Sequence, residues 1–67
     1  MNTNKDLHLG MEVKRRLKNR GMTVSEFARR INCSRNNVYN IYKRRYIDIE
    51  LLQTISVVLE YDFIHNI

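Results

Sequence analysis

Hydrophobic residues recur near both ends of the chain at the spacing of an amphipathic helix. In the N-terminal half, Leu9, Val13 and Leu17 lie four residues apart, which places them on one face of a helix beginning at about residue 7. Gly21 is expected to end this helix, because glycine adopts the left-handed backbone of a helix C-terminus at little cost. In the C-terminal half, a similar apolar face is formed by Ile49, Leu52, Ile55 and Leu59.

Three short polar residues mark the starts of helices in the rest of the chain. Thr23, Ser34 and Asp48 each carry a side-chain oxygen that can accept a hydrogen bond from the first turn of a helix. Each follows an apolar residue and is itself followed four residues later by another, as in a hydrophobic staple. Glu26 would complete a capping box by reaching back to the Thr23 N–H. We therefore expect helices to begin at about residues 24, 35 and 49.

The helices that begin at residues 24 and 35 are joined by a connection too short for an antiparallel hairpin. The first extends only to about residue 31, and residues 32–34 then turn the chain directly into the next. Asn32 suits the left-handed backbone that such a turn requires. The two helices should therefore cross steeply, as in a helix-turn-helix. The apolar residues expected between them are Phe27, Ala28, Ile31, Val38 and Ile41.

The predicted fold class is all-α, a compact bundle of four to five short helices in one domain. The fifth would be a short turn of helix over residues 62–67, and residues 1–6 would be a mobile N-terminal arm ahead of a domain spanning residues 7–67. A chain of 67 residues buries only about 60% of its unfolded surface, so a deep water-excluding cleft is not expected. An enzyme is therefore the least favoured class, and we expect no catalytic residues and no small-molecule substrate.

Cysteine and histidine are too sparse for metal or disulfide chemistry. His8, Cys33 and His65 are far apart, and no paired metal-ligand motif exists. The single cysteine cannot form an internal disulfide, which fits a reducing compartment. No Gly-rich phosphate-binding loop is present either. We therefore expect neither metal nor cofactor.

Positive charge is concentrated in the middle of the chain. The net charge is +5, yet between Lys14 and Arg45 eleven basic residues face one acid, Glu26, giving that stretch +10. Outside it one lysine faces six acidic residues. Such a one-sided field suits a polyanion, with nucleic acid favoured over an anionic membrane surface. No run of eighteen apolar residues is present, so a membrane-spanning segment is not expected.

With these helices and this charge distribution, the chain resembles the lambda-repressor-like, Cro-type helix-turn-helix proteins, which bind operator DNA. The resemblance covers about residues 9–63, and it implies that the helix over residues 35–44 lies in the major groove. It also implies the bacterial or phage cytoplasm, at the nucleoid. The residues that carry it are Gly21-Met22-Thr23, Glu26-Phe27-Ala28, Ile31-Asn32-Cys33-Ser34, Val38, Ile41 and Asp48-Ile49-Glu50, with Leu52, Ile55 and Leu59.

The chain departs from the family pattern at three places. Val24 stands where the family commonly has a glutamine that contacts a phosphate, so one backbone contact is expected to be missing. Asn32 replaces a glycine in the turn. The loop over residues 42–46 lacks the usual glycine and is unusually basic. We expect the fold to tolerate Asn32, whereas the geometry of the loop stays open.

The outward side of the 35–44 helix carries the expected DNA-contacting side chains. Arginine can pair bidentately with guanine and asparagine with adenine. Asparagine is a poor helix former, so its repeated use on this helix points to a role other than helix stability. The residues expected to read bases are Arg35, Asn36, Tyr39 and Asn40. Those expected to contact the DNA backbone are Thr23, Ser34, Lys43, Arg44 and Arg45.

Simpler interpretations of these residues stay open. Polar residues can be ordinary solvent-exposed positions, and basic residues near helix C-termini interact favourably with the helix dipole without any ligand. Tyr42 and Tyr46 can pack over the corner between the third and fourth helices. The alternative functions are a protein–protein interaction module on the same scaffold, and RNA or single-strand binding through the tyrosines.

Apolar residues near the C-terminus exceed what one helix face needs. Some must close the core, and the others suggest a homodimer through the C-terminal apolar surface, or a chain that continues past residue 67. Two-fold symmetry would place two reading helices about 34 Å apart and predicts a roughly palindromic operator. The residues concerned are Leu51, Val57, Val58, Phe63, Ile64 and Ile67.

Overall fold

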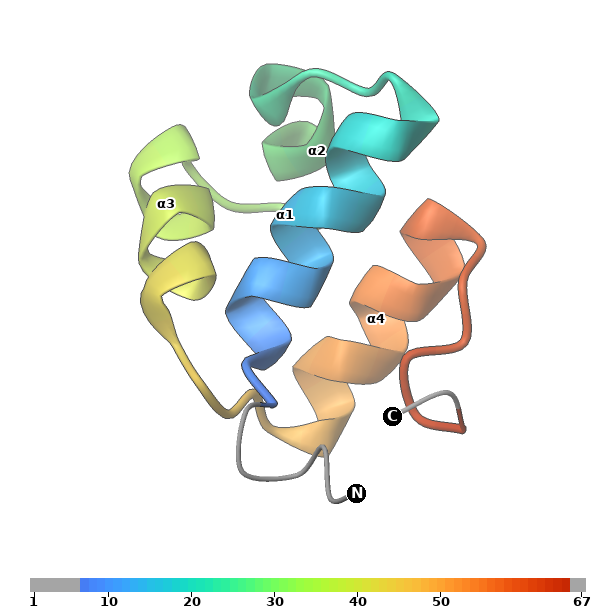
Figure 1. Ribbon diagram of the computed structural model, residues 1–67. Helices are drawn as coiled ribbons and strands as arrows, with labels where there is room; N and C mark the ends of the chain where they lie inside the picture. The colour runs from blue at the N-terminus through green and yellow to red at the C-terminus, as the bar shows by residue number, and fades with distance from the viewer. Residues whose placement is uncertain (1–6, 66–67) are drawn as a thin grey trace.

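Four helices form the fold in the computed structural model, which describes residues 7–65 (Figure 1). They are α1 (Leu9–Arg20), α2 (Val24–Arg30), α3 (Arg35–Lys43) and α4 (Ile49–Leu59). No strand occurs within these residues, so the predicted all-α class is confirmed. The predicted arm over residues 1–6, and any part played by Ile67, lie outside the described residues.

The helices begin where their capping residues predict. The side chains of Thr23, Ser34 and Asp48 each accept a hydrogen bond from the backbone N–H three residues later, at 3.1–3.2 Å. The capping box at Thr23 is only half formed, because the Glu26 carboxylate turns instead to Arg30, 2.9 Å away. The first helix begins two residues later than expected, at Leu9, with the His8 Nδ1 atom accepting from the Met11 N–H at 3.1 Å.

Three of the helices end in the same left-handed turn. Gly21, Asn32 and Glu60 have φ angles of 77°, 63° and 54°. After each of them, the next residue donates its N–H to the carbonyl five residues earlier, the Schellman arrangement. The left-handed backbone predicted at Asn32 is therefore confirmed. Glu60 was not expected to adopt this conformation, which is strained for a residue with a long side chain.

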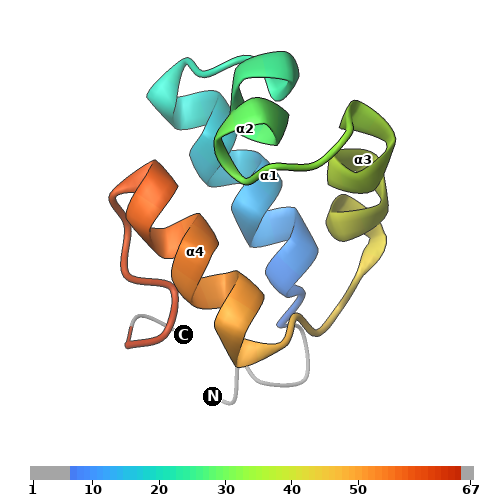
Figure 2. The ribbon, with the colours of Figure 1, turned by 180° about the vertical axis from the view of Figure 1, so that it is seen from behind.

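The core lies where α1 packs against both α3 and α4, while α2 covers the C-terminal end of α1 and packs on α3 (Figures 1 and 2). Ile49, predicted on the inner face of α4, is 56% exposed, so that prediction is wrong. Ile49 is the first residue of the helix, and Ile47 in the preceding segment fills the core there instead. The buried residues are Leu9, Val13, Leu17, Phe27, Ala28, Val38, Ile41, Ile47, Leu52, Ile55, Leu59 and Phe63.

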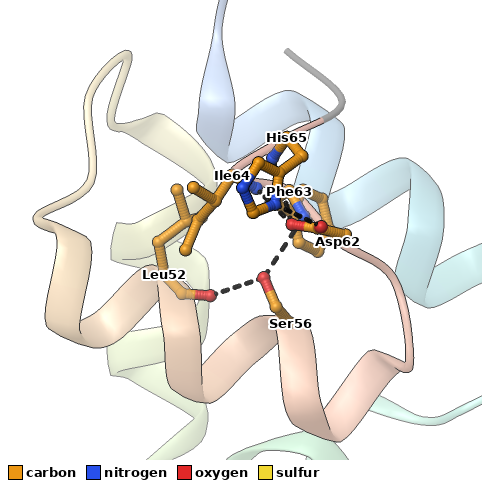
Figure 3. A network of polar contacts seen from close by, with 6 residues as sticks. All are labelled: Leu52, Ser56, Asp62, Phe63, Ile64 and His65. Atoms are coloured by element: carbon orange, nitrogen blue, oxygen red, sulfur yellow. Dashed lines mark hydrogen bonds and ion pairs between the residues drawn. The ribbon is translucent and has the colours of Figure 1, made fainter.

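The segment after α4 folds back onto that helix (Figure 3). The Ser56 hydroxyl donates to the Leu52 carbonyl at 2.8 Å and accepts from the Phe63 N–H at 3.3 Å. Asp62 Oδ1 accepts from the N–H groups of Ile64 and His65. Phe63 is thereby held in the core, 1% exposed. Residues 63–65 form a turn, and the rest of the fifth helical element expected there lies outside the described residues.

The loop after α3 is fixed to the start of α1. The N–H groups of Leu9 and Gly10 donate to the carbonyls of Arg45 and Arg44, both at 2.9 Å. A Cβ atom on Gly10 would lie 2.5 Å from the Tyr42 carbonyl oxygen and 2.6 Å from that of Arg44, so only glycine fits there. Within residues 7–65 no position of this loop has a positive φ. The loop therefore needs no glycine of its own. The glycine that the close contact requires is Gly10, on α1.

Candidate nucleic-acid interface

Helix α3 presents a continuous polar face to solvent on the outside of the bundle (Figure 1). Val38 and Ile41 are buried, at 0% and 4% exposure, which fixes the rotation of the helix. Helical spacing then puts Asn36, Asn40 and Lys43 at the centre of the outer face. The residues exposed as predicted are Ser34, Arg35, Asn36, Tyr39, Asn40 and Lys43.

The tyrosines on and after α3 differ in their surroundings. Tyr39 is 48% exposed, and its ring meets that of half-buried Tyr42 edge to face, with centroids 6.0 Å apart. The Lys14 Nζ atom lies 5.7 Å from the centre of the Tyr42 ring. Burial, and to a smaller extent Tyr39, raises the pKa of the Tyr42 phenol. Tyr46 is 73% exposed, so the expectation that it packs over the corner after α3 is wrong, whereas Tyr42 does pack against the core.

A small cavity borders the exposed face of α3, between this helix, the turn before it and the start of α4. Its volume is about 160 Å³, and its lining includes the side chains of Asn37, Asn40 and Arg44. Cys33 borders the same cavity, and burial raises the pKa of its thiol. The thiol donates to the Ser34 carbonyl at 3.4 Å, as a small packing residue in the turn.

The few acids near the basic residues neutralise arginines of α1 and α2. Arg15 pairs with Glu12, Arg20 lies 3.2 Å from the Glu60 carboxylate, and Glu26 holds both arginines of the last turn of α2. Within residues 7–65, six other basic side chains have no carboxylate within 4 Å. They are Lys14, Arg16, Lys18, Arg35, Lys43 and Arg44. The unpaired positive charge therefore lies on α3, on the loop after it, and on two lysines and one arginine of α1.

The remaining residues expected to contact the DNA backbone have structural partners. The Arg45 guanidinium donates to the Leu7 carbonyl, which adds a side-chain bond to the contact between the loop and α1. The hydroxyls of Thr23 and Ser34 accept their capping hydrogen bonds, and both residues are exposed. Because a hydroxyl has a donor besides its acceptor lone pairs, capping leaves each O–H free to donate.

Two contacts of α1 have no signal in the sequence pattern. From the sequence, Gly10 is only a residue of low helix propensity, although it lies where α1 approaches the end of α3 and the loop after it closely. Arg16 reads as one of a basic cluster, yet its guanidinium lies 3.8 Å from the centre of the Tyr61 ring. Both contacts join segments more than thirty residues apart, so local sequence spacing cannot indicate them.

Among residues 7–65, no three His, Cys, Asp or Glu side chains gather as metal ligands would. None of the four helices has the length and apolar character needed to cross a bilayer.

Comparison with known protein families matches residues 12–63 to the Cro/C1-type HTH DNA-binding domain. Comparisons with curated proteins and with solved structures return no significant match. The matched segment contains α2, α3 and α4 in full and most of α1, and therefore includes the helix-turn-helix and its exposed face. The chain belongs to the family of Cro/C1-type HTH DNA-binding domains.

Proposed function

We propose that this domain binds duplex DNA sequence-specifically, as a transcriptional regulator that inserts α3 into the major groove. The observation that carries the proposal is the outer face of α3, where Asn36, Asn40 and Lys43 are exposed and no carboxylate of residues 7–65 lies within 4 Å of the Lys43 ammonium group. An α-helix fits the major groove, and amide and guanidinium groups match the hydrogen-bonding edges of adenine and guanine there. Such a role belongs at the bacterial or phage nucleoid.

The contacts divide into those that read bases and those that hold the backbone. Arg35, Asn36, Tyr39 and Asn40 would read bases, each good bidentate pair contributing about 1–3 kcal/mol of discrimination. Phosphate contacts set the register of the protein on the duplex without carrying sequence information. The residues proposed for these contacts are Thr23, Ser34, Lys43, Arg44 and Arg45.

Selection of bound duplexes from a random pool tests the proposal directly. An enriched sequence establishes specific recognition, and failure to enrich any sequence refutes it. On the enriched duplex, replacing Arg35 or Asn36 with alanine should relax the base preference. Replacing Lys43 or Arg44 with alanine should instead weaken binding to all sequences alike and flatten its salt dependence.

We propose further that two copies bind a palindromic site as a homodimer through the C-terminal apolar surface. Val57 is 76% exposed and Ile49 56% exposed on α4, and Ile64 in the segment after this helix is half-buried. The two reading helices would then lie about 34 Å apart. A palindrome among the enriched duplexes, together with a dimer mass in sedimentation, is the expected result. A single half-site bound by a monomer would contradict it.

Single-strand or RNA binding is a second candidate, because Tyr39 on α3 and Tyr46 in the loop after it are 48% and 73% exposed. Aromatic side chains of this kind stack on unpaired bases. Titrating a duplex and one of its strands at two salt concentrations separates the candidates. Preference for the duplex supports the regulator, preference for the strand supports the alternative, and no salt-dependent affinity for either indicates a protein interaction module.

A further inference from the structure

A cleft separates α1 from α3 beside the proposed reading face. Its volume is about 210 Å³, below the roughly 300–1,000 Å³ of pockets that enclose drug-sized ligands. The floor is apolar and consists of Leu17, Met22 and Val24. The rim consists of Lys14 and Lys18 from α1 and Tyr39 and Tyr42 from α3. The cleft therefore suits a small group that has an apolar part and a negative charge.

The charges around the cleft all have one sign. No acidic side chain lines it, and neither lysine on its rim has a carboxylate within 4 Å among residues 7–65. Lys14 is held over the Tyr42 ring, so its ammonium group is kept at the rim. Tyr39 belongs to both the cleft and the exposed face of α3. A group bound in the cleft would therefore adjoin whatever α3 contacts.

We propose that this cleft binds one sugar–phosphate unit of the DNA strand beside α3. Lys14 and Lys18 would neutralise the phosphate, and the apolar floor around Val24 would pack against the deoxyribose. The inference rests on the proposed DNA binding and adds a backbone contact made by α1. It also gives Val24 a part in that contact, because an apolar side chain suits the sugar where a polar one would suit the phosphate.

The salt dependence of binding tests the lysines on a duplex enriched by selection. The variant Lys14→Ala/Lys18→Ala loses two positive charges from the rim, and Arg15→Ala/Arg29→Ala loses two exposed charges outside the cleft. Loss of one neutralised phosphate should reduce the slope of log K against log salt by about 0.9 in the lysine variant. The arginine variant should change the slope clearly less. Equal changes in the two variants would show that only overall charge matters and would overturn the proposal.

A neutral methylphosphonate linkage, placed in turn at each phosphate, locates the contact. In the wild-type protein one linkage beside the α3 contacts should weaken binding, and in Lys14→Ala/Lys18→Ala the same linkage should have no further effect. If that linkage weakens both proteins equally, the cleft does not hold the phosphate. If the wild-type protein binds no duplex at all, the proposed function fails first, so the two failures are distinguishable.

A third variant tests the apolar side of the cleft. Val24 is the first residue of α2 and packs partly against the core, so Val24→Asp loses apolar burial that the favourable helix dipole offsets only in part, and its binding is measured below its own melting temperature. A carboxylate there would repel the phosphate, and we expect binding to fall at least about tenfold. Ser25→Asp adds the same charge at the next residue, which does not line the cleft, and should weaken binding less. Equal losses in the two variants would contradict the proposal.

Discussion

Replacing Gly10 with alanine tests the contact between α1 and the loop after α3. The added Cβ would lie 2.5 Å and 2.6 Å from the carbonyl oxygens of Tyr42 and Arg44, and closer still to that of Ile41. Carbon and carbonyl oxygen ordinarily approach to about 3.3 Å. The start of α1 must therefore retreat by roughly 0.7 Å or more. Because all three obstacles are backbone atoms, no side-chain rotation can relieve the clash.

The cost can be estimated from the interactions that this retreat disturbs. Two hydrogen bonds, from the N–H groups of Leu9 and Gly10, contribute about 0.5–1.5 kcal/mol each. Overpacking at a tight contact costs about 1–3 kcal/mol. Alanine regains about 1 kcal/mol of helix preference over glycine. We therefore expect Gly10→Ala to lower the free energy of unfolding by about 3 kcal/mol, a large share of the stability of a small domain.

Urea and thermal unfolding followed by circular dichroism measure this loss. A loss of 3 kcal/mol should lower the melting temperature by more than about 10 °C. Gly21→Ala is the matched control, because a Cβ there meets no atom within 4 Å and the cost comes only from the φ of 77°. That cost is about 1–2 kcal/mol. The reasoning is refuted if Gly10→Ala unfolds at the wild-type midpoint or loses no more stability than Gly21→Ala.

The C-terminal part of the fold supports three further predictions. Glu60→Gly should raise the free energy of unfolding by about 0.5–1 kcal/mol, because glycine relieves the strain of the left-handed backbone. Glu60→Gln loses the ion pair with Arg20 but keeps the strain, so it should not raise the free energy of unfolding. A destabilised glycine variant would mean that the ion pair outweighs the strain. Ser56→Ala should lower the free energy of unfolding measured in urea by about 1–2 kcal/mol, because the Ser56 hydroxyl makes two hydrogen bonds. The exposed Thr54 hydroxyl makes one, so an equal loss in Thr54→Ala would contradict the structural role of Ser56. Hydrogen bonds from His65 hold the pKa of Asp62 below its ordinary 3.8, so Asp62 stabilises the fold above that pH and the contribution is lost as the pH falls. Asp62→Asn should therefore lose less stability than the wild type between pH 5.5 and pH 3, measured as urea midpoints. Equal losses would show that Asp62 does not contribute to the pH dependence of stability.

The predictable part of the fold is the part that depends on neighbouring residues. The helix starts at residues 24, 35 and 49 follow from capping side chains that act over three residues, and all three are confirmed. The outward position of Ile49 and the strained backbone at Glu60 were not predictable in this way. They depend on residues outside the helix, because Ile47 before it and Phe63 after it are both buried in the core.

The part of the candidate site that the sequence predicts is the rotation of α3 about its own axis. Because Val38 and Ile41 must be buried, the sequence alone places Arg35, Asn36, Tyr39 and Asn40 outside, and all four are exposed. The DNA contacts of these residues stay a prediction. The cleft between α1 and α3 could not be predicted, because its lysines and tyrosines come from helices that meet only in the folded chain. Of the ion pairs of the arginines, only Arg20 with Glu60 depends on the folded chain in this way, because the pairs of Glu12 and Glu26 lie within one helix at i, i+3 and i, i+4 spacing.

The pairing of charges connects the fold to the proposed function. Each of Glu12, Glu26 and Glu60 pairs with an arginine of α1 or α2, so these acids neutralise positive charge away from α3. Unpaired positive charge is left on α3, on the loop that Gly10 fixes to α1, along the cleft, and on Arg16, which lies over the Tyr61 ring. The field at the proposed interface is therefore more positive than the net charge of +5 implies. A change that loosens the contact at Gly10 should then weaken DNA binding as well as stability, because it moves the unpaired Lys43 and Arg44 relative to α1.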